Sequence, residues 1–274
     1  PYVSLRLPYR RGEASESERL LEVRPGFRPV VHQILSFERL TSKDGHQPQH
    51  TVVTSGTGSG KTECYLYPVL DHCLRRAGRP GVKAVILYPM NALASDQARR
   101  FAQEIWGDPR LRGRVTAGMY VGGHGDDRTM GPENVITDRD TLRNHPPDIL
   151  MTNYKMLDYL MIRPEDQKVW RETGPDSVQY LVLDELHTYD GAQGSDVACL
   201  IRRFKAKLRT LPGSLCCVGT SATLAGEEAR ATADLVEFAS RLFGETIPRT
   251  GVIREDRVGT AEYLGAGEAH FGVP

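Results

Sequence analysis

A glycine-rich stretch at residues 55–62 has the residue types and spacing of a phosphate-binding loop. It reads Ser-Gly-Thr-Gly-Ser-Gly-Lys-Thr, which fits the pattern G-x-x-x-x-G-K-[ST] except that Ser55 stands at the first position. The stretch follows an apolar run and opens a helical pattern, so its backbone amides and the helix N-terminus can surround a phosphate. A glycine-rich turn without function would leave the Lys-Thr pair unexplained. We predict a site for ATP and Mg²⁺ whose loop ligands are Thr57, Gly58, Ser59, Gly60, Lys61 and Thr62.

Two carboxylates follow another apolar run. Asp184 and Glu185 come directly after Tyr-Leu-Val-Leu at 180–183, and ligands of open α/β sheets bind at the carboxyl ends of the strands. We expect Asp184, together with the Thr62 hydroxyl, to hold Mg²⁺, and Glu185 to orient and deprotonate the water that attacks the γ-phosphate. A surface charge cluster is the alternative, but carboxylates in this position usually have a function. With Lys61, the pair predicts ATP hydrolysis.

A group of hydroxyls ends a third apolar run. Thr220, Ser221 and Thr223 follow Leu-Cys-Cys-Val-Gly at 215–219, which places them at the same sheet edge as His187. We interpret them as a polar relay next to the acidic pair. The alternative is that Thr223 only caps a helix.

The elements that must position these residues alternate along the chain. Short β-branched runs are separated by helical patterns, which predicts an α/β fold with a mainly parallel sheet and helices on both faces. The strands are expected at 50–54, 83–88, 114–121, 148–152, 179–184 and 214–219.

Two segments between the expected strands carry further predictions. The helical pattern at 195–211 has an apolar stripe that ends at Leu211, and a basic face that we interpret as solvated, with docking on another domain or a phosphate backbone as the alternative. Residues 122–147 are rich in Gly and Asp and are expected to protrude as a mobile loop with a short helix.

Composition sets wide limits. The chain has 274 residues, 39% apolar and 26% charged, which is typical of one large globular domain. Lys plus Arg equals Asp plus Glu at 35 each, so global charge neither supports nor excludes a nucleic-acid partner. Apolar runs are far shorter than the roughly 20 residues of a membrane span, and the five cysteines show no zinc-ligand spacing. We expect a cytoplasmic protein with reduced thiols and, from Pro1 and the abrupt end, a piece of a longer chain.

Five segments in this order carry a family resemblance. SGTGSGKT, YPMNALASDQ, DILMTNYKML, DELH and TSAT resemble motifs I, Ia, Ic, II and III of superfamily 2 helicases of the DEAD/DEAH-box type. The phrase HTYDGAQGSDVACLIRRF resembles the Lhr-like and YprA-like branch, which includes large helicases of bacterial anti-phage defence systems. The resemblance implies a P-loop NTPase RecA-like domain, the first of two, at 27–250. Residues 1–26 would be an approach segment, and 251–274 the start of a linker to the second RecA-like domain.

The resemblance also implies residue roles. Gln33 would bind the adenine, and His187 would couple hydrolysis to the hydroxyl motif. One nucleic-acid strand would be held by its phosphates, without a sequence code, by Pro89, Asn91, Arg99, Thr152 and Asn153. The second domain would supply arginine fingers, commonly worth ~10³ to 10⁵ in rate, so this segment alone should bind Mg-ATP and hydrolyse it hardly at all.

The implied function is that of an ATP-dependent DNA helicase or translocase. Its partners would be nucleic acid, with DNA favoured over RNA, the second domain of the same protein, and proteins of a defence system. Three alternatives stay open: a nucleotide-gated nucleic-acid clamp, a translocase on duplex DNA that does not unwind it, and an RNA helicase. A metabolic P-loop kinase would leave TSAT and TNYKML unexplained.

Overall fold

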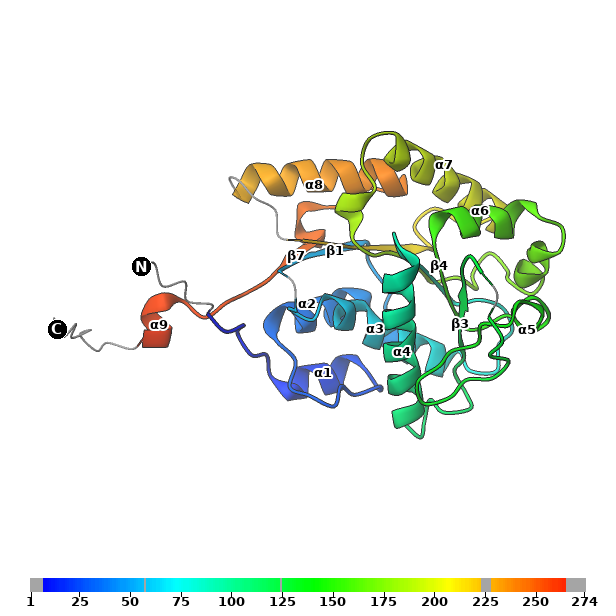
Figure 1. The fold of residues 1–274 in the computed structure, drawn as a ribbon. Coiled ribbons are helices and arrows are strands. Elements are labelled where there is room, and N and C mark those ends of the chain that lie inside the picture. The colour runs from blue at the N-terminus through cyan, green and yellow to red at the C-terminus, as the bar shows by residue number, and fades with distance from the viewer. Residues whose placement is uncertain (1–6, 57, 124, 223–227, 265–274) are drawn as a thin grey trace, which may run out of the picture.

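A seven-stranded sheet forms the centre of the molecule (Figure 1). The computed structural model describes residues 7–56, 58–123, 125–222 and 228–264. The strand order is β3-β4-β2-β5-β6-β1-β7, and all six neighbouring pairs are parallel. The strands are β1 Thr51–Thr54, β2 Ala84–Leu87, β3 Ala117–Tyr120, β4 Ile149–Thr152, β5 Tyr180–Leu183, β6 Cys216–Ser221 and β7 Val252–Arg254. The expected α/β fold with a parallel sheet is confirmed.

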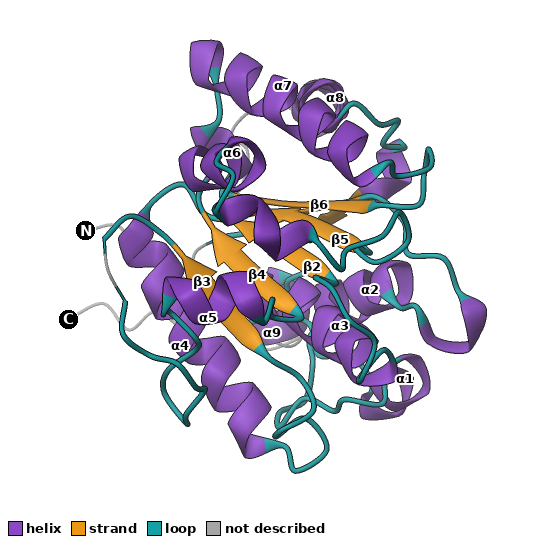
Figure 2. Ribbon diagram, turned by 90° about the vertical axis from the view of Figure 1, so that its right-hand side faces the viewer, coloured by secondary structure: helices purple, strands orange, loops and turns teal. Residues whose placement is uncertain are grey.

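Helices cover both faces of the sheet (Figures 1 and 2). They are α1 Ala14–Leu20, α2 Val31–Leu40, α3 Lys61–Arg75, α4 Asn91–Gly107, α5 Arg139–Asn144, α6 Tyr154–Ile162, α7 Gly191–Leu208, α8 Glu228–Phe243 and α9 Thr260–Leu264. The described residues also form short 3-10 helices, which are η1 Lys43–Gly45, η2 Asp166–Trp170, η3 Leu186–Thr188 and η4 Arg249–Gly251. None of the helices in the described ranges combines the length and apolarity required to cross a bilayer.

Side-chain alternation explains why two helical layers are required. In β5, Leu181 and Leu183 pack into the core beneath α6, α7 and α8, whereas Tyr180 and Val182 pack against α2, α3 and α4. Successive residues of a strand point to opposite faces, and a parallel strand buried on both faces is therefore apolar throughout. The short apolar runs in the sequence correspond to these short buried strands.

Helix α7 departs from its expected end. The helix ends at Leu208, because Arg209 takes a left-handed conformation with φ of 56°. Leu211 therefore lies beyond the helix and is 70% exposed, and its expected place on the buried stripe is wrong. The basic face is only partly solvated, since Arg202 and Lys207 donate to main-chain carbonyls of α8 and α6.

Two further segments differ from expectation. Residues 252–254 fall within the expected linker, yet they form β7 and pair with β1. The described part of 122–147 does not simply protrude, because Ile136 pairs with β3 through hydrogen bonds to Ala117 and Met119. Val135 and Ile136 are buried in the core. Both segments pair with strands that are distant from them in the sequence.

The buried His72 of α3 makes stability dependent on pH. Ser42 Oγ accepts a 2.7 Å hydrogen bond from Arg75 and also lies 2.7 Å from His72 Nδ1, so the imidazole is hydrogen-bonded inside the fold next to a cationic side chain. Burial and nearby cations lower the pKa of His72 to about 3, whereas its ordinary value is 6.5. The unfolded chain therefore binds a proton below pH 6.5 that the folded chain excludes, and stability falls as the pH drops below 6.5.

The His72 contribution to the free energy of unfolding should fall by about 2 kcal/mol between pH 7 and pH 5. Urea unfolding of the wild type and of His72→Gln at both pH values measures this contribution. Between pH 7 and pH 5 the free energy of unfolding should fall by about 2 kcal/mol less in the variant than in the wild type. His145→Gln, which changes an exposed histidine, is the control and should behave as wild type. Equal pH dependence in wild type and His72→Gln would contradict the assignment.

Candidate active site

The carboxyl ends of β1 and β5 bring the phosphate loop and the acidic pair to one cavity. Its volume is about 600 Å³. Eight of the residues expected at the nucleotide and metal site line it: Gln33, Gly58, Ser59, Gly60, Lys61, Thr62, Asp184 and Glu185. Thr57 lies outside the described residues. The sequence therefore predicted the centre of this cavity.

Glycine is required in the loop for conformation and for space. Gly58 and Gly60 have φ of 73° and 83°, in the left-handed region that favours glycine. A Cβ atom on Gly60 would lie 2.3 Å from Gln33 Nε2. Lys61 is the first residue of α3, so the unpaired amides of the helix N-terminus face the cavity together with its ammonium group. Lys61 Nζ donates to Ser55 O at 3.1 Å.

Thr220 binds both members of the acidic pair. Strands β5 and β6 are parallel with Leu183 opposite Gly219, so the next residues, Asp184 and Thr220, lie side by side. The Thr220 hydroxyl donates to Asp184 Oδ1 and accepts a 3.0 Å hydrogen bond from the Glu185 amide. Asp184 is only 4% exposed, and this burial raises its pKa to about 6.

Glu185 lies between two basic side chains. Its Oε1 is 3.7 Å from Lys61 Nζ, and its Oε2 is 3.3 Å from Nδ1 of the half-exposed His187. Its backbone is left-handed, with φ of 52°. Among the described residues, His187 has no hydrogen bond to Thr220 or Ser221, and Thr223 lies outside them. The hydroxyl motif reaches the acidic pair directly through Thr220.

The oxygen donors fit a magnesium ion. The Thr62 hydroxyl and the Asp184 carboxylate line the same cavity, and Mg²⁺ prefers oxygen ligands from one or two carboxylates completed by phosphate and water. The donor chemistry thus agrees with the metal ligands expected from the sequence.

Gln33 lines the cavity, but its amide is already engaged. Its Oε1 accepts from the Val30 amide at 3.0 Å, and its Nε2 donates to Gly60 O at 3.3 Å. Further lining residues that sequence reasoning missed are Tyr9, Phe27, Arg28 and Arg100. Phe27 is an exposed aromatic residue six positions before Gln33; Tyr9 and Arg100 reach the cavity through the fold.

Three of the five residues expected to bind nucleic acid line a second cavity. Pro89, Asn91 and Asn153 surround a space of about 360 Å³ together with Lys155. Asn153 Nδ2 donates to Asn91 Oδ1 at 2.8 Å, and its Oδ1 caps α6. Asn153 comes directly after β4, and Asn91 comes four residues after the end of β2, so both lie at the sheet edge that also carries the nucleotide cavity.

The other two residues are placed differently. Thr152 is fully buried, and its hydroxyl donates to Tyr120 O at 2.5 Å, so this side chain is turned away from the surface. Arg99 lies on the exposed side of α4 and does not line the second cavity. Neither side chain joins the Asn91 and Asn153 pair.

Known proteins resemble this chain in sequence or in fold. The Druantia protein DruE of Escherichia coli (strain UMEA 4076-1) is 26% identical over 79% of this chain and 17% of its own length. YprA of Bacillus subtilis (strain 168), described as an uncharacterized ATP-dependent helicase, is 31% identical over 71% of this chain and 23% of its own length. The crystal structure of the DUF1998 helicase MrfA bound to DNA is 25% identical, with a TM-score of 0.63, over 90% of this chain and 31% of MrfA.

The chain thus spans less than a third of each of these proteins. Its fold is the RecA-like domain expected from the motifs. The family model described as DEAD/DEAH box helicase matches residues 31–232, which include the phosphate loop, the acidic pair and the hydroxyl motif. This chain belongs to the DEAD/DEAH box helicase family.

Proposed function

We propose that this chain binds Mg-ATP and, within a larger protein, couples ATP hydrolysis to movement on DNA or to its unwinding. The observation that carries the proposal is the arrangement at one sheet edge. Lys61, Asp184 and Glu185 line one cavity, and the Asn91 and Asn153 pair lies beside a second cavity at the same edge. A motor requires a nucleotide site and a strand site that can influence each other.

Each residue of the nucleotide cavity has a separate task. The loop amides and Lys61 bind the phosphates. Thr62 and Asp184 hold Mg²⁺, which neutralises phosphate charge when it is bound. Glu185 orients the attacking water and takes its proton. Glu185 is suited to this because its carboxylate lies 3.7 Å from the Lys61 ammonium that marks the phosphate position.

Helix α4 offers a physical link between the two cavities. Asn91, its first residue, lines the strand cavity. Gln97 and Arg100, further along the same helix, line the nucleotide cavity. A packed helix moves as a rigid unit, so a strand that displaces Asn91 also displaces groups that face the nucleotide. His187 and the hydroxyl motif complete this coupling in our proposal.

DNA is the proposed strand because the MrfA structure contains DNA. A second RecA-like domain, elsewhere in the protein, would supply the arginine fingers. Similarity to DruE supports a place in a defence system with partner proteins, and we place the protein in the cytoplasm.

ATPase assays of the intact protein test the proposal. Turnover should rise with single-stranded DNA more than with RNA, and strand-displacement assays should show unwinding. Stimulation with neither unwinding nor displacement of a DNA triplex would favour a clamp, and triplex displacement alone would favour a duplex translocase. No stimulation by any nucleic acid would overturn the proposal.

Asn153→Asp should raise the Kd for single-stranded DNA about tenfold or more, because it places a negative charge against the phosphates at a cost of at least about 1.4 kcal/mol. The aspartate still caps α6. Fluorescence anisotropy with labelled DNA measures the Kd. Asn144→Asp adds the same charge at the exposed end of α5, ahead of β4 and so near the opposite sheet edge, and should bind DNA as wild type does. Equal Kd values for both variants would contradict the strand site.

A further inference from the structure

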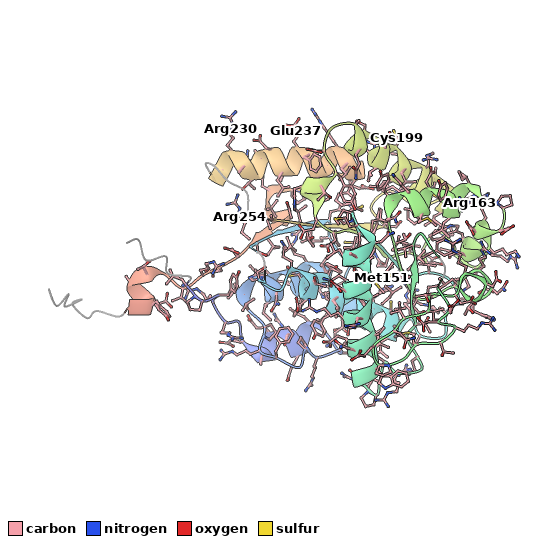
Figure 3. All side chains as sticks on the ribbon, viewed as in Figure 1. Met151, Arg163, Cys199, Arg230, Glu237 and Arg254 are labelled. Carbon is pink, nitrogen blue, oxygen red and sulfur yellow. The ribbon has the colours of Figure 1, made fainter. Side chains whose placement is uncertain are left out.

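The segment that follows β7 contacts the phosphate loop through Glu255. Strand β7 pairs in parallel with β1, and Thr54 is opposite Arg254. The residues after these two strands therefore leave the sheet side by side. The Gly56 amide donates a 2.7 Å hydrogen bond to Glu255 Oε2. Arg254, labelled in Figure 3, lies between α8 and the point where β7 leaves the sheet.

Two side chains hold the Glu255 carboxylate in place. Arg257 Nε donates to Glu255 Oε1 at 2.9 Å, and Arg257 Nη2 donates to the Tyr9 hydroxyl at 2.8 Å. The Arg257 guanidinium also lies 4.2 Å from the centre of the Tyr9 ring. Tyr9 and Arg257 pair as antiparallel neighbours, so residues 7–11 and 255–258 run side by side (Figure 1). We call these two segments the strap.

The strap also reaches the far end of the loop. The Tyr9 ring packs edge-on against His32, with ring centres 5.5 Å apart. Burial lowers the pKa of His32, which is therefore neutral, and its Nε2 donates to Ser59 O at 3.0 Å. The loop is held at Gly56 and at Ser59, on both sides of Gly58.

A carboxylate beside a loop that binds anions must have its negative charge stabilised, and Arg257 and the Gly56 amide do this for Glu255. Burial raises the pKa of Glu255, but hydrogen bonds from Arg257 and the Gly56 amide outweigh this, and the net pKa lies below the ordinary value. The carboxylate is ionised at neutral pH, and hydrogen bonds to ionised groups are roughly twice as strong as neutral ones. Glu255 does not line the nucleotide cavity, so it acts on the nucleotide only through the loop.

We propose that Glu255 is a positioning residue that holds the phosphate loop in the shape required to bind ATP, an inference that rests on the proposed ATP site. A loop that is already ordered loses less conformational freedom when its ligand binds. Through the strap, the conformation of the phosphate loop therefore depends on the chain segment after β7.

Nucleotide binding and turnover of three variants of the intact protein test this role. Glu255→Ala should raise the Kd of a fluorescent ATP analogue and the KM for ATP about tenfold. The kcat at saturating ATP should stay within about twofold, because the reacting groups are untouched. Glu255→Gln should recover most of the affinity, since its amide oxygen still accepts from Gly56. Glu262→Ala removes a 2.9 Å ion pair with Arg10 of the strap without touching the loop and should behave as wild type.

The proposal is overturned if Glu255→Ala keeps the wild-type Kd and KM, if Glu255→Gln is as weak as Glu255→Ala, or if Glu262→Ala shows the same loss. The Kd is measured without nucleic acid and without turnover. A failure of the proposed motor activity therefore appears in the wild-type protein, whereas a failure of the Glu255 role appears only when the variants are compared.

Discussion

Glu185→Gln should lower the kcat for ATP about 10² to 10⁴-fold, the range expected when a general base is removed. ATP binding should be retained, because glutamine has the same shape and removes a negative charge from the side of the γ-phosphate. The expected product is a protein that binds ATP and keeps it unhydrolysed. Single-turnover hydrolysis and filter binding with radiolabelled ATP, on the intact protein with saturating DNA, measure both quantities.

Glu237→Gln is the matched control for that experiment. Glu237 is exposed on α8 (Figure 3), where it pairs with Arg241, and it does not line the nucleotide cavity, so this variant should hydrolyse ATP at the wild-type rate. Normal hydrolysis by Glu185→Gln would show that another group takes the proton from water.

Lys61→Ala should lower kcat/KM for ATP by about 10²-fold or more, since one fixed donor to developing phosphate charge is typically worth 10²–10³ in rate. Unlike Glu185→Gln, it should also weaken nucleotide binding, because Lys61 contacts the phosphates before and during the reaction. Titration with a fluorescent ATP analogue and steady-state ATPase assays separate the two effects.

A lysine elsewhere on the surface controls for loss of charge. Lys168→Ala removes an exposed ammonium in η2 and should leave kcat/KM unchanged. If Lys61→Ala binds and hydrolyses ATP normally, the phosphates do not lie at the N-terminus of α3.

The sequence predicted those parts of the site that directly follow an apolar run along the chain. A phosphate loop, an acidic pair and a hydroxyl motif each end an apolar strand, and parallel strands bring such ends to one edge. For the same reason Asp184 and Thr220 meet, although they are 36 residues apart.

The missed parts depend on contacts between distant segments. Strand β7 has only three residues, too few for a periodic pattern, and its pairing with β1 follows from the fold. Thr152 was expected to bind nucleic acid, but β4 is buried on both faces and the Thr152 hydroxyl donates to Tyr120 O. Tyr9 lines the nucleotide cavity, and it is held there by pairing between residues 7–11 and 255–258, which are far apart in the sequence.

The left-handed backbone of Glu185 has a consequence for how such a domain can change over time. A side chain other than glycine in this conformation costs roughly 1 kcal/mol or more. Glycine at this position would relieve that strain and at the same time remove the carboxylate. Selection for stability alone would therefore favour glycine here, whereas the proposed role of Glu185 in ATP hydrolysis requires the strained residue.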